Sequence, residues 1–386
     1  IVPHLKGLTG AGTAAWGDAV CVIPYNHYRM YGDIAIIEDN IEAMKKWVSY
    51  LCNHSNGYIR PAEGYGDWLS VGEKTSPDLV ASLYYFYCTQ LMKEMCATIG
   101  DKVHAAQYAA EGKAIQAAFK KHYMDASSRM VTNSSAYGDG TGYVEGQNGF
   151  SGHTQTAYAN AIYMGLLEEE DLQKAGQYLR ELVESNGNKL TTGFLGFKPL
   201  LPALSATGSS DKAYALLLSE EYPSLGYEIA NGATSIWERW DSYIKDKGFV
   251  HNAAMNSFSH YAFGSVNEWM FENMLGIKAL NPGFSKVAIK PEIADKEVKS
   301  VSGSYRSIAG MLKSAWQVEA NHVQQKVEIP VNCIALCYVK ATAVKQIKLD
   351  GKPLDKQPYL RSVNQEGDYF VLELGSGDYT IETQKM

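Results

Sequence analysis

Apolar residues recur at helical spacing through roughly the first 280 positions of the chain. Because a helix places every third or fourth residue on one face, this pattern predicts amphipathic helices. The expected helices span residues 14–31, 33–53, 76–99, 101–124, 152–164, 168–183, 198–206, 211–219, 223–230 and 255–276. About ten helices in antiparallel pairs, joined by short turns, favour an (α/α) toroid.

Polar residues and glycines mark the breaks between these helices. Asp33 is placed to cap the second helix, and Ser76-Pro77 combines a cap residue with a proline at the first helical position. Residues 127–150 are rich in Gly, Ser and Asn, which predicts a loop or a short hairpin. Paired helices with long loops between the pairs are the arrangement expected of a toroid that carries its functional residues on loops.

The apolar period changes after Asn281-Pro282-Gly283, where alternation replaces the helical pattern. Strands are expected over residues 287–289, 298–301, 326–330, 334–339, 347–349, 369–374 and 379–382, with a hairpin turn at Asp350-Gly351. The fold class is therefore mainly α with a β domain: a helical domain over residues 1–280 and a small antiparallel β-sandwich over 281–386. No aromatic cluster stands out on the predicted strands, so the sandwich is expected to brace the helical domain rather than to bind sugar independently.

The helix count is smaller than a complete toroid of six pairs requires, which is about twelve. We expect the missing pair to precede Ile1, so that the (α/α)6-barrel domain is incomplete at its N-terminal side. The chain also begins without a methionine and shows no basic segment followed by an apolar one, as a signal peptide would. A processed product or an excised piece is expected.

Composition excludes several classes of protein. With 386 residues, 46% of them hydrophobic, the chain can bury one large core and a second, smaller one. A formal net charge of -7 argues against nucleic acid or an anionic membrane as the main partner, and no apolar run is long enough for membrane insertion. The six cysteines are scattered without a C-x-x-C pair, which favours buried thiols over a disulfide framework or a metal site. No cofactor is expected.

The residues from Gly232 to Asp241 (GATSIWERWD) carry the most distinctive chemistry. Glu238 stands between Trp237 and Trp240, with Arg239 beside it. Indole rings can stack on a sugar, and a carboxylate oriented by an arginine can act as a base or a nucleophile, which indicates a glycosidase. The alternative is that both tryptophans belong to a half-buried helical turn and that Glu238 and Arg239 form a solvated pair.

Six short motifs occur in the order found in bacterial α-L-rhamnosidases of glycoside hydrolase family 78, and this resemblance covers nearly the whole chain. The motifs are Ala14-Ala15-Trp16-Gly17-Asp18-Ala19, Gly66-Asp67-Trp68-Leu69, Gln155-Thr156-Ala157-Tyr158, Gly193-Phe194-Leu195-Gly196, Gly232-Ala233-Thr234 through Trp240-Asp241, and Asn256-Ser257 to His260-Tyr261-Ala262-Phe263-Gly264. The resemblance implies an (α/α)6-barrel followed by a C-terminal β-sandwich. It also implies inverting hydrolysis of terminal α-L-rhamnose from glycosides or polysaccharides.

Roles for individual residues follow from the same resemblance. Glu238 is similar to the general base of the family, the carboxylate that activates the attacking water. Asp18 and Asp67 lie within matching motifs and are expected near the sugar; the alternative is that their carboxylates cap loops. The resemblance gives the substrate-binding side chains as Trp16, Trp68 and His260 in the wall of the rhamnose pocket, and Asp18, Asp67 and Trp237 near that pocket.

The sequence departs from the family at one point. Family members carry an acidic motif, D-x-P-x-R-D-E-R, before the Ala-Trp-Gly-Asp run, and this motif supplies the general acid; the chain has no such motif. Because an inverting glycosidase needs both an acid and a base, the acid is expected upstream of Ile1. The alternatives are another (α/α)-toroid glycosidase or lyase, or a non-catalytic carbohydrate-binding protein. An exported protein, periplasmic or extracellular, is expected rather than a cytoplasmic one.

Overall fold

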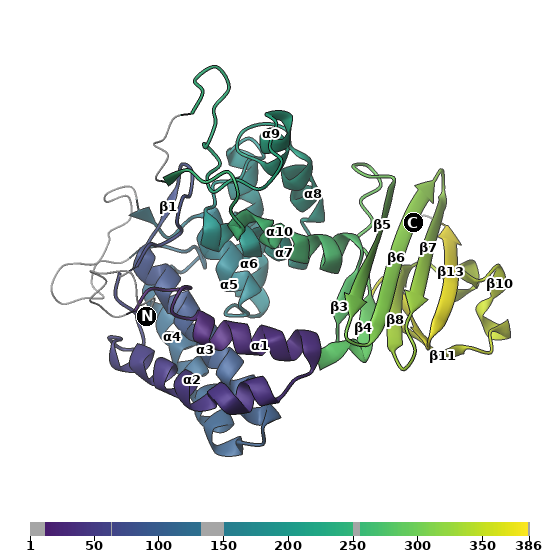
Figure 1. The fold of residues 1–386 in the computed structure, drawn as a ribbon, viewed down its shortest axis with the longest axis horizontal. Helices are drawn as coiled ribbons and strands as arrows, with labels where there is room; N and C mark the ends of the chain where they lie inside the picture. Colours follow the sequence, from purple (N-terminus) through teal and green to yellow (C-terminus); the bar gives the residue numbers. More distant parts are fainter. Residues whose placement is uncertain (1–11, 63, 133–149, 250–254, 385–386) are drawn as a thin grey trace. The chain divides into compact units, whose positions relative to one another are not determined.

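The computed structural model describes residues 12–62, 64–132, 150–249 and 255–384 (Figure 1). The chain divides into two compact units. The first contains the residues up to Tyr25 and Ile37–Val266, and the second combines Asn26–Ile36 with Asn267–Met386. The predicted loop at residues 127–150 lies for the most part outside the described residues.

Helices dominate the chain as far as residue 230. They are α1 (Ala19–Tyr31), α2 (Ala35–Asn53), α3 (Pro77–Thr98), α4 (Lys102–Tyr123), α5 (Gln155–Tyr163), α6 (Glu169–Ser185), α7 (Phe194–Ala206), α8 (Ser210–Leu218) and α9 (Leu225–Ala230). Neighbours in sequence pack as pairs, α3 against α4 and α7 against α8, while α5 contacts both α6 and α7. The two-residue strands β1 (Lys74–Thr75) and β2 (Phe150–Ser151) pair in parallel beside them.

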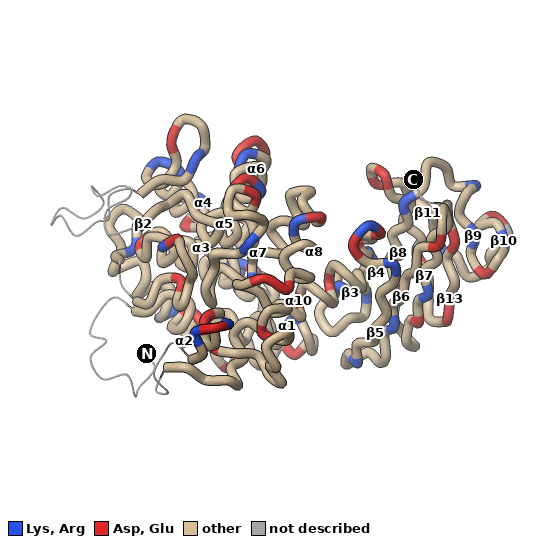
Figure 2. The backbone as a smooth tube through the Cα atoms, turned by 90° about the horizontal axis from the view of Figure 1, so that it is seen from above, with Lys and Arg blue, Asp and Glu red and all other residues tan. Residues whose placement is uncertain are grey.

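The helix sequences explain which helices are central. Helix α3 buries residues on all its faces, among them Leu79, Tyr85 and Cys88, whereas α6 buries one stripe and exposes acidic and basic residues on the other side. Acidic and basic positions are interspersed along the described backbone (Figure 2). None of the described helices combines the length and the hydrophobicity that crossing a bilayer requires.

Of the helices α1 to α9, α1 and α7 differ most from their predicted starting residues; α5 and α9 also begin later than predicted, at Gln155 and Leu225. Helix α1 starts at Ala19 and not at residue 14, because Ala15 takes a left-handed conformation (φ 68°) and its N–H donates to the Asp18 carboxylate at 2.7 Å. Helix α7 starts at Phe194 and not at residue 198, because the Gly193-Phe194-Leu195-Gly196 motif forms its first turn.

The long helix predicted over residues 255–276 is wrong in its first half. Residues 256–261 contain no helix. Two backbone hydrogen bonds hold this segment beside residues 236–238: Glu238 N donates to the Ser257 oxygen (2.9 Å), and His260 N to the Ile236 oxygen (2.8 Å). Helix follows only afterwards, as a 3₁₀ turn (Ala262–Ser265), α10 (Val266–Trp269) and a π turn (Met270–Met274).

The second unit is a β-sandwich. One sheet has the order β10-β9-β13-β7-β6-β5 and the other the order β11-β12-β8-β4-β3. The strands are β3 (Ile277–Ala279), β4 (Lys286–Ile289), β5 (Ser300–Ser307), β6 (Gly310–Glu319), β7 (His322–Ile329), β8 (Ile334–Lys340), β9 (Lys348–Leu349), β10 (Lys352–Pro353), β11 (Leu360–Glu366), β12 (Tyr369–Leu374) and β13 (Gly377–Gln384). Neighbouring strands run antiparallel except β4 and β8, which are parallel. Side chains such as Val287, Leu312 and Leu372 form the core.

The hairpin predicted at Asp350-Gly351 is confirmed. Both residues have positive φ (51° and 74°), and β9 pairs antiparallel with β10 across them. The sequence did not predict β3, β6 or β11. Strand β6 alternates buried and exposed positions along its length, but its polar positions include the buried Ser314, which masks the pattern.

Of the six cysteines, five are buried, as expected. Cys52 is exposed, and the expectation is wrong for this residue, which lies in the last turn of α2. All six are free thiols.

Candidate active site

Glu238 lies in the irregular segment that follows α9. Its backbone N–H donates to the Ser257 oxygen, and its carboxylate Oε2 accepts a hydrogen bond from Ser257 N, both at 2.9 Å. These two bonds between the same residues fix the carboxylate relative to the backbone of the neighbouring segment. The side chain is partly exposed, and within the described residues Oε1 accepts no hydrogen bond from the protein. One oxygen is thus oriented and the other remains able to receive a proton from solvent or substrate.

Arg239 does not orient Glu238, contrary to the prediction. Its Nε donates to Asp241 Oδ1 at 2.9 Å in an ion pair two residues along the chain. The solvated pair of Glu238 and Arg239 that was the alternative is wrong for the same reason. The charge on Arg239 therefore stabilises the loop that carries Glu238.

The two tryptophans beside Glu238 are buried. Trp240, 1% exposed, donates from its indole Nε1 to the Thr192 oxygen at 2.9 Å and stacks on Phe263 with ring centroids 3.9 Å apart. Trp237 contacts Phe258 edge to face at 5.4 Å. Both rings act as packing anchors, as in the buried-core alternative, but on a loop rather than a helical turn. A contact of Trp237 with sugar stays a prediction.

Trp16 and Trp68 come together although they are far apart in sequence. Tyr65 lies between them, with its ring 5.0 Å from that of Trp16 and 5.2 Å from that of Trp68, both edge to face. All three side chains are partly exposed. A half-exposed aromatic wall suits the apolar face of a sugar ring. Tyr65 was missed from the sequence, because a tyrosine in a glycine-rich loop has no pattern that marks it.

His260 lies on the segment that pairs with the Glu238 loop. Its Nδ1 accepts a hydrogen bond from Ala262 N at 3.3 Å, so the ring hydrogen is assigned to Nε2. The imidazole contacts the Phe194 ring at 5.0 Å and stacks on Tyr261 at 5.1 Å. The structure therefore brings Glu238 and His260 onto two hydrogen-bonded segments, and leaves an Nε2–H that can donate to a hydroxyl.

Asp67 is a buried anchor for helix α7. Its carboxylate accepts four hydrogen bonds: from Thr156 Oγ1 (2.5 Å) and from the backbone N–H groups of Gly193 (2.7 Å), Leu195 (2.8 Å) and Gly196 (3.0 Å). An anion at the N-terminus of a helix satisfies the free N–H groups there. Burial raises the pKa of Asp67. These contacts support the capping alternative, and a sugar contact of Asp67 stays a prediction.

Asp18 has a similar position before helix α1. It accepts hydrogen bonds from Ala15 N (2.7 Å), from the Trp47 indole (2.9 Å) and from the Cys88 thiol (3.2 Å). Its side chain is 1% exposed, and burial raises its pKa. The carboxylate thus joins three parts of the helical unit, and a sugar contact of Asp18 likewise stays a prediction.

Glu228 is a buried acid that the sequence did not indicate. It lies on α9 and is 2% exposed. Its Oε2 accepts a hydrogen bond from Trp237 N at 3.2 Å, and among the described residues Oε1 has no partner. Burial raises the pKa of Glu228 to about 8. Its carbonyl oxygen also accepts from Ala233 N (3.0 Å), so Glu228 ties down both ends of the loop before Glu238. A glutamate on a short helix carries no sequence signal that separates this role from a solvated one.

In the described part of the chain, no group of three or more His, Cys, Asp or Glu side chains could hold a metal ion.

Comparisons with known families match both parts of the chain. Residues 1–274 match the bacterial alpha-L-rhamnosidase 6 hairpin glycosidase domain, and residues 276–352 match the bacterial alpha-L-rhamnosidase C-terminal domain. Among curated proteins, an alpha-L-rhamnosidase of Streptomyces avermitilis is 34% identical over 97% of the chain, and one of Formosa agariphila is 30% identical over 97%. The chain spans 33% and 39% of the lengths of these two relatives.

Comparison with solved structures also matches the chain to alpha-L-rhamnosidases. The Streptomyces avermitilis alpha-L-rhamnosidase complexed with L-rhamnose is similar over 99% of the chain and 34% of its own, with a TM-score of 0.86 and 33% sequence identity. The alpha-L-rhamnosidase from Dictyoglumus thermophilum is similar over 97% of the chain and 40% of its own, with a TM-score of 0.82 and 25% identity.

Proposed function

The chain belongs to the bacterial α-L-rhamnosidase family, and on that premise we propose that the protein hydrolyses terminal α-L-rhamnosyl residues of glycosides or polysaccharides with inversion at the anomeric carbon. The relatives named alpha-L-rhamnosidase, one of them complexed with L-rhamnose, support the substrate class. The single observation that carries the proposal is the state of Glu238: one carboxylate oxygen is fixed by Ser257, and the other accepts no hydrogen bond from the described residues.

The geometry suits a general base. In the proposed reaction the open oxygen of Glu238 takes a proton from water as that water attacks the anomeric carbon. The half-exposed wall of Trp16, Tyr65 and Trp68 can cover the apolar face and methyl group of the 6-deoxy sugar. His260 Nε2 can donate to a sugar hydroxyl, which would orient the ring for attack.

The leaving oxygen needs a separate general acid, about 6.5–9.5 Å from the base. Asp18 and Asp67 do not suit this role, because each is buried and receives its hydrogen bonds from the surrounding protein. Family resemblance puts the acid on the N-terminal side of the Ala-Trp-Gly-Asp motif. We propose that a carboxyl group from there completes the pair with Glu238.

The test compares hydrolysis of p-nitrophenyl α-L-rhamnoside by the 386-residue chain and by the full-length product of its gene. We expect activity in the longer protein and little or none in the 386-residue chain. Replacement of Glu238 by Gln in the active protein should lower kcat by about 10²–10⁴-fold with the fold intact, because general base catalysis contributes about that much. Glu220→Gln, at an exposed acid on the surface, is the control and should leave kcat unchanged.

Near-normal turnover of Glu238→Gln would remove Glu238 from the mechanism. Fresh product observed by NMR should be the β-anomer of rhamnose, since inversion reverses the α configuration; the α-anomer would contradict the proposed stereochemistry. Release of sugars other than rhamnose from a panel of aryl glycosides would instead favour another toroid glycosidase.

A further inference from the structure

A cavity of about 200 Å³ lies in the β-sandwich, lined by both sheets. From the six-stranded sheet come Val318 on β6, Gln325 on β7 and Thr383 on β13; from the other sheet come residues of β8 and β12. This volume is smaller than the range of about 300–1,000 Å³ that is typical of pockets for drug-sized ligands. The cavity is therefore considered for a smaller ligand, such as a single sugar residue.

Gln325 is the unusual member of this lining. Along β7, the other side chains on its face of the strand are the buried Val323, Val327 and Ile329. Gln325 itself is 4% exposed; its Nε2 makes a long hydrogen bond to the Tyr338 oxygen (3.4 Å), and among the described residues its Oε1 has no partner. An unpaired buried carboxamide oxygen destabilises the folded state, so a missing donor is expected at this position.

The rest of the lining contains apolar, polar, charged and aromatic side chains. Val318 and Val323 belong to a small apolar cluster with Trp316, and Ile293 packs against it. Thr383, 5% exposed, supplies a second buried polar group, whose hydroxyl donates only weakly to the Gln384 oxygen at 3.4 Å. One part of the lining is thus apolar, and another offers an acceptor and a hydroxyl. The lining also includes charged and aromatic side chains, namely Asp295, Lys340, Tyr338 and Tyr369.

We propose that this cavity binds one 6-deoxyhexose, such as a terminal L-rhamnosyl unit, as a second sugar site separate from Glu238. A sugar hydroxyl donates to Gln325 Oε1, a second hydroxyl pairs with Thr383 Oγ1, and the edge that carries the methyl group lies against Val318 and Val323. The choice of sugar rests on the proposed function. A second site would hold a rhamnose-bearing chain near the enzyme between cleavage events.

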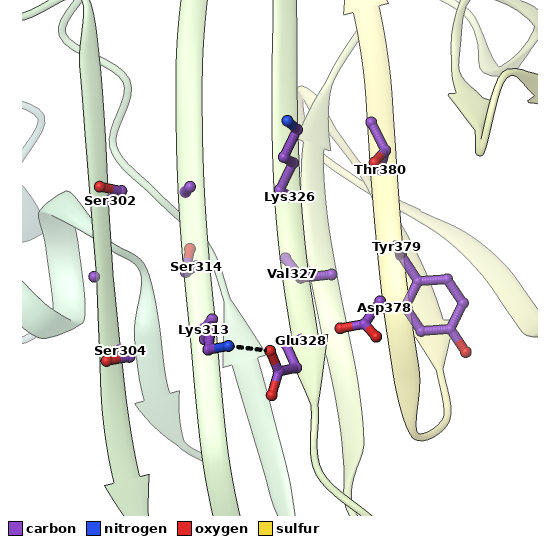
Figure 3. Close-up of a pocket in the computed structure, with 12 residues that line it drawn as sticks. Ser302, Ser304, Lys313, Ser314, Lys326, Val327, Glu328, Asp378, Tyr379 and Thr380 are labelled. Carbon is purple, nitrogen blue, oxygen red and sulfur yellow. Dashed lines mark ion pairs between the residues drawn. The ribbon is translucent and has the colours of Figure 1, made fainter.

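A larger hollow, of about 500 Å³, is a weaker candidate. It lies across β5, β6, β7 and β13, and its polar side chains include Ser302, Ser304 and Lys313 (Figure 3). Lys313 is already paired with Glu328 at 2.6 Å. Among the described residues that line it, no buried side chain is left without a hydrogen-bond partner. This hollow therefore gives no sign of a missing ligand.

The test is a titration of the 386-residue chain with L-rhamnose, by calorimetry or ligand-observed NMR, with glycerol as the control polyol. Gln325→Leu replaces the carboxamide by an apolar group of similar volume. It removes the acceptor Oε1 together with the long hydrogen bond from Nε2 to the Tyr338 oxygen. We expect this variant to bind one rhamnose fewer than the wild type, or to bind rhamnose at that site about tenfold more weakly. Its melting temperature should be no lower than that of the wild type. Gln324→Leu, one residue away and facing the other side of β7, should bind as the wild type.

Binding at the sandwich cavity and binding at the Glu238 site give different results in this titration. If the Glu238 site binds no rhamnose, the wild type still shows one site, which Gln325→Leu removes. If Gln325→Leu binds exactly as many rhamnose molecules as the wild type with equal affinity, the inference is overturned. Crystals soaked in L-rhamnose should show the sugar in the cavity, whereas ordered water only would also overturn it. Thr383→Val, with the same expected loss of binding, replaces Gln325→Leu if that variant fails to fold.

Discussion

The carboxylates of Asp67, Glu228 and Glu238 have different hydrogen-bond partners, and their roles differ accordingly. The carboxylate of Asp67 accepts hydrogen bonds from four donors, whereas that of Glu228 accepts one long hydrogen bond and, among the described residues, has one oxygen without a partner. Glu238, on the loop that Glu228 holds in place, is partly exposed, and one of its oxygens accepts no hydrogen bond from the described residues. The number of donors around each carboxylate, rather than its neighbours in sequence, distinguishes an anchor from a candidate base.

Glu228 should make the stability of the protein depend on pH. Its pKa is raised by burial from 4.5 to about 8, so between these values the folded state holds a proton that the unfolded state has lost. The contribution of Glu228 to the free energy of unfolding therefore falls as pH rises through this window, by about 1.4 kcal/mol per pH unit, and levels off above pH 8.

Replacement of Glu228 by Gln removes this titration and keeps an oxygen that can accept from Trp237 N. Urea unfolding at pH 5, 6.5, 8 and 9 should show the wild type losing stability relative to Glu228→Gln up to about pH 8 and no further. A difference between the two proteins that is the same at all four pH values would show that Glu228 is ionised in the folded state throughout.

At the scale of elements, helix α7 depends on close approach of two backbones. Its N-cap residue, Gly193, lies against the segment of Trp68: Phe194 N donates to the Trp68 oxygen at 2.9 Å, and a Cβ on Gly193 would lie 2.1 Å from that oxygen. The same turn supplies the N–H groups that bind Asp67. The beginning of α7 thereby positions the segment of Trp68, which belongs to the aromatic wall with Trp16 and Tyr65.

Gly193→Ala should therefore both destabilise the fold and disturb the aromatic wall. Because the clash is with backbone atoms, the segment must shift, and we expect a loss of about 1–3 kcal/mol in unfolding free energy together with weaker rhamnose binding. Thermal or urea unfolding and a rhamnose titration measure the two effects.

Gly375→Ala is the matched control, since a Cβ there would meet only the end of the flexible Arg361 side chain, at 3.4 Å. If Gly193→Ala were as stable as this control, the close approach would have no energetic importance.

At the scale of the whole molecule, the expected fold class is confirmed: a six-hairpin glycosidase domain of paired helices followed by a β-sandwich. The boundary predicted at residue 280 stays a prediction. The two compact units are not continuous stretches of the chain, because Asn26–Ile36 belongs to the same unit as Asn267–Met386. Within that second unit, the Arg29 guanidinium donates to the Ala279 oxygen at 2.9 Å, and Met30 packs against the core of the sandwich.

Arg29→Ala should accordingly lower the stability of the sandwich although residue 29 is far from it in sequence. Loss of a hydrogen bond from a charged donor costs about 2 kcal/mol. Hydrogen exchange at the amides of β3 and β4 should report the change locally, and urea unfolding should report it globally. Arg306→Ala, at an exposed arginine of β5, is the control. Equal exchange rates in the two variants would argue against a structural role for Arg29.

By itself, the sequence determined the features that local patterns encode. The spacing of apolar residues distinguished helices from strands, and Asp350-Gly351 specified a hairpin. The motifs around Trp16, Asp67 and Glu238, in their order along the chain, indicated the family. These succeed because backbone preference and burial of one face act over a few neighbouring residues.

Only the tertiary structure decided which polar groups meet. The chain segment at 256–261 pairs with the Glu238 loop instead of continuing as a helix, and Arg239 pairs with Asp241. Within the part of the chain that the structure describes, Glu228 and Gln325 each have a buried oxygen without a hydrogen-bond partner. Hydrogen bonding and desolvation depend on atoms brought together from distant parts of the chain, and no local pattern records them. For that reason the family could be inferred from the residues alone, whereas the state of each carboxylate and the cavity in the sandwich could not.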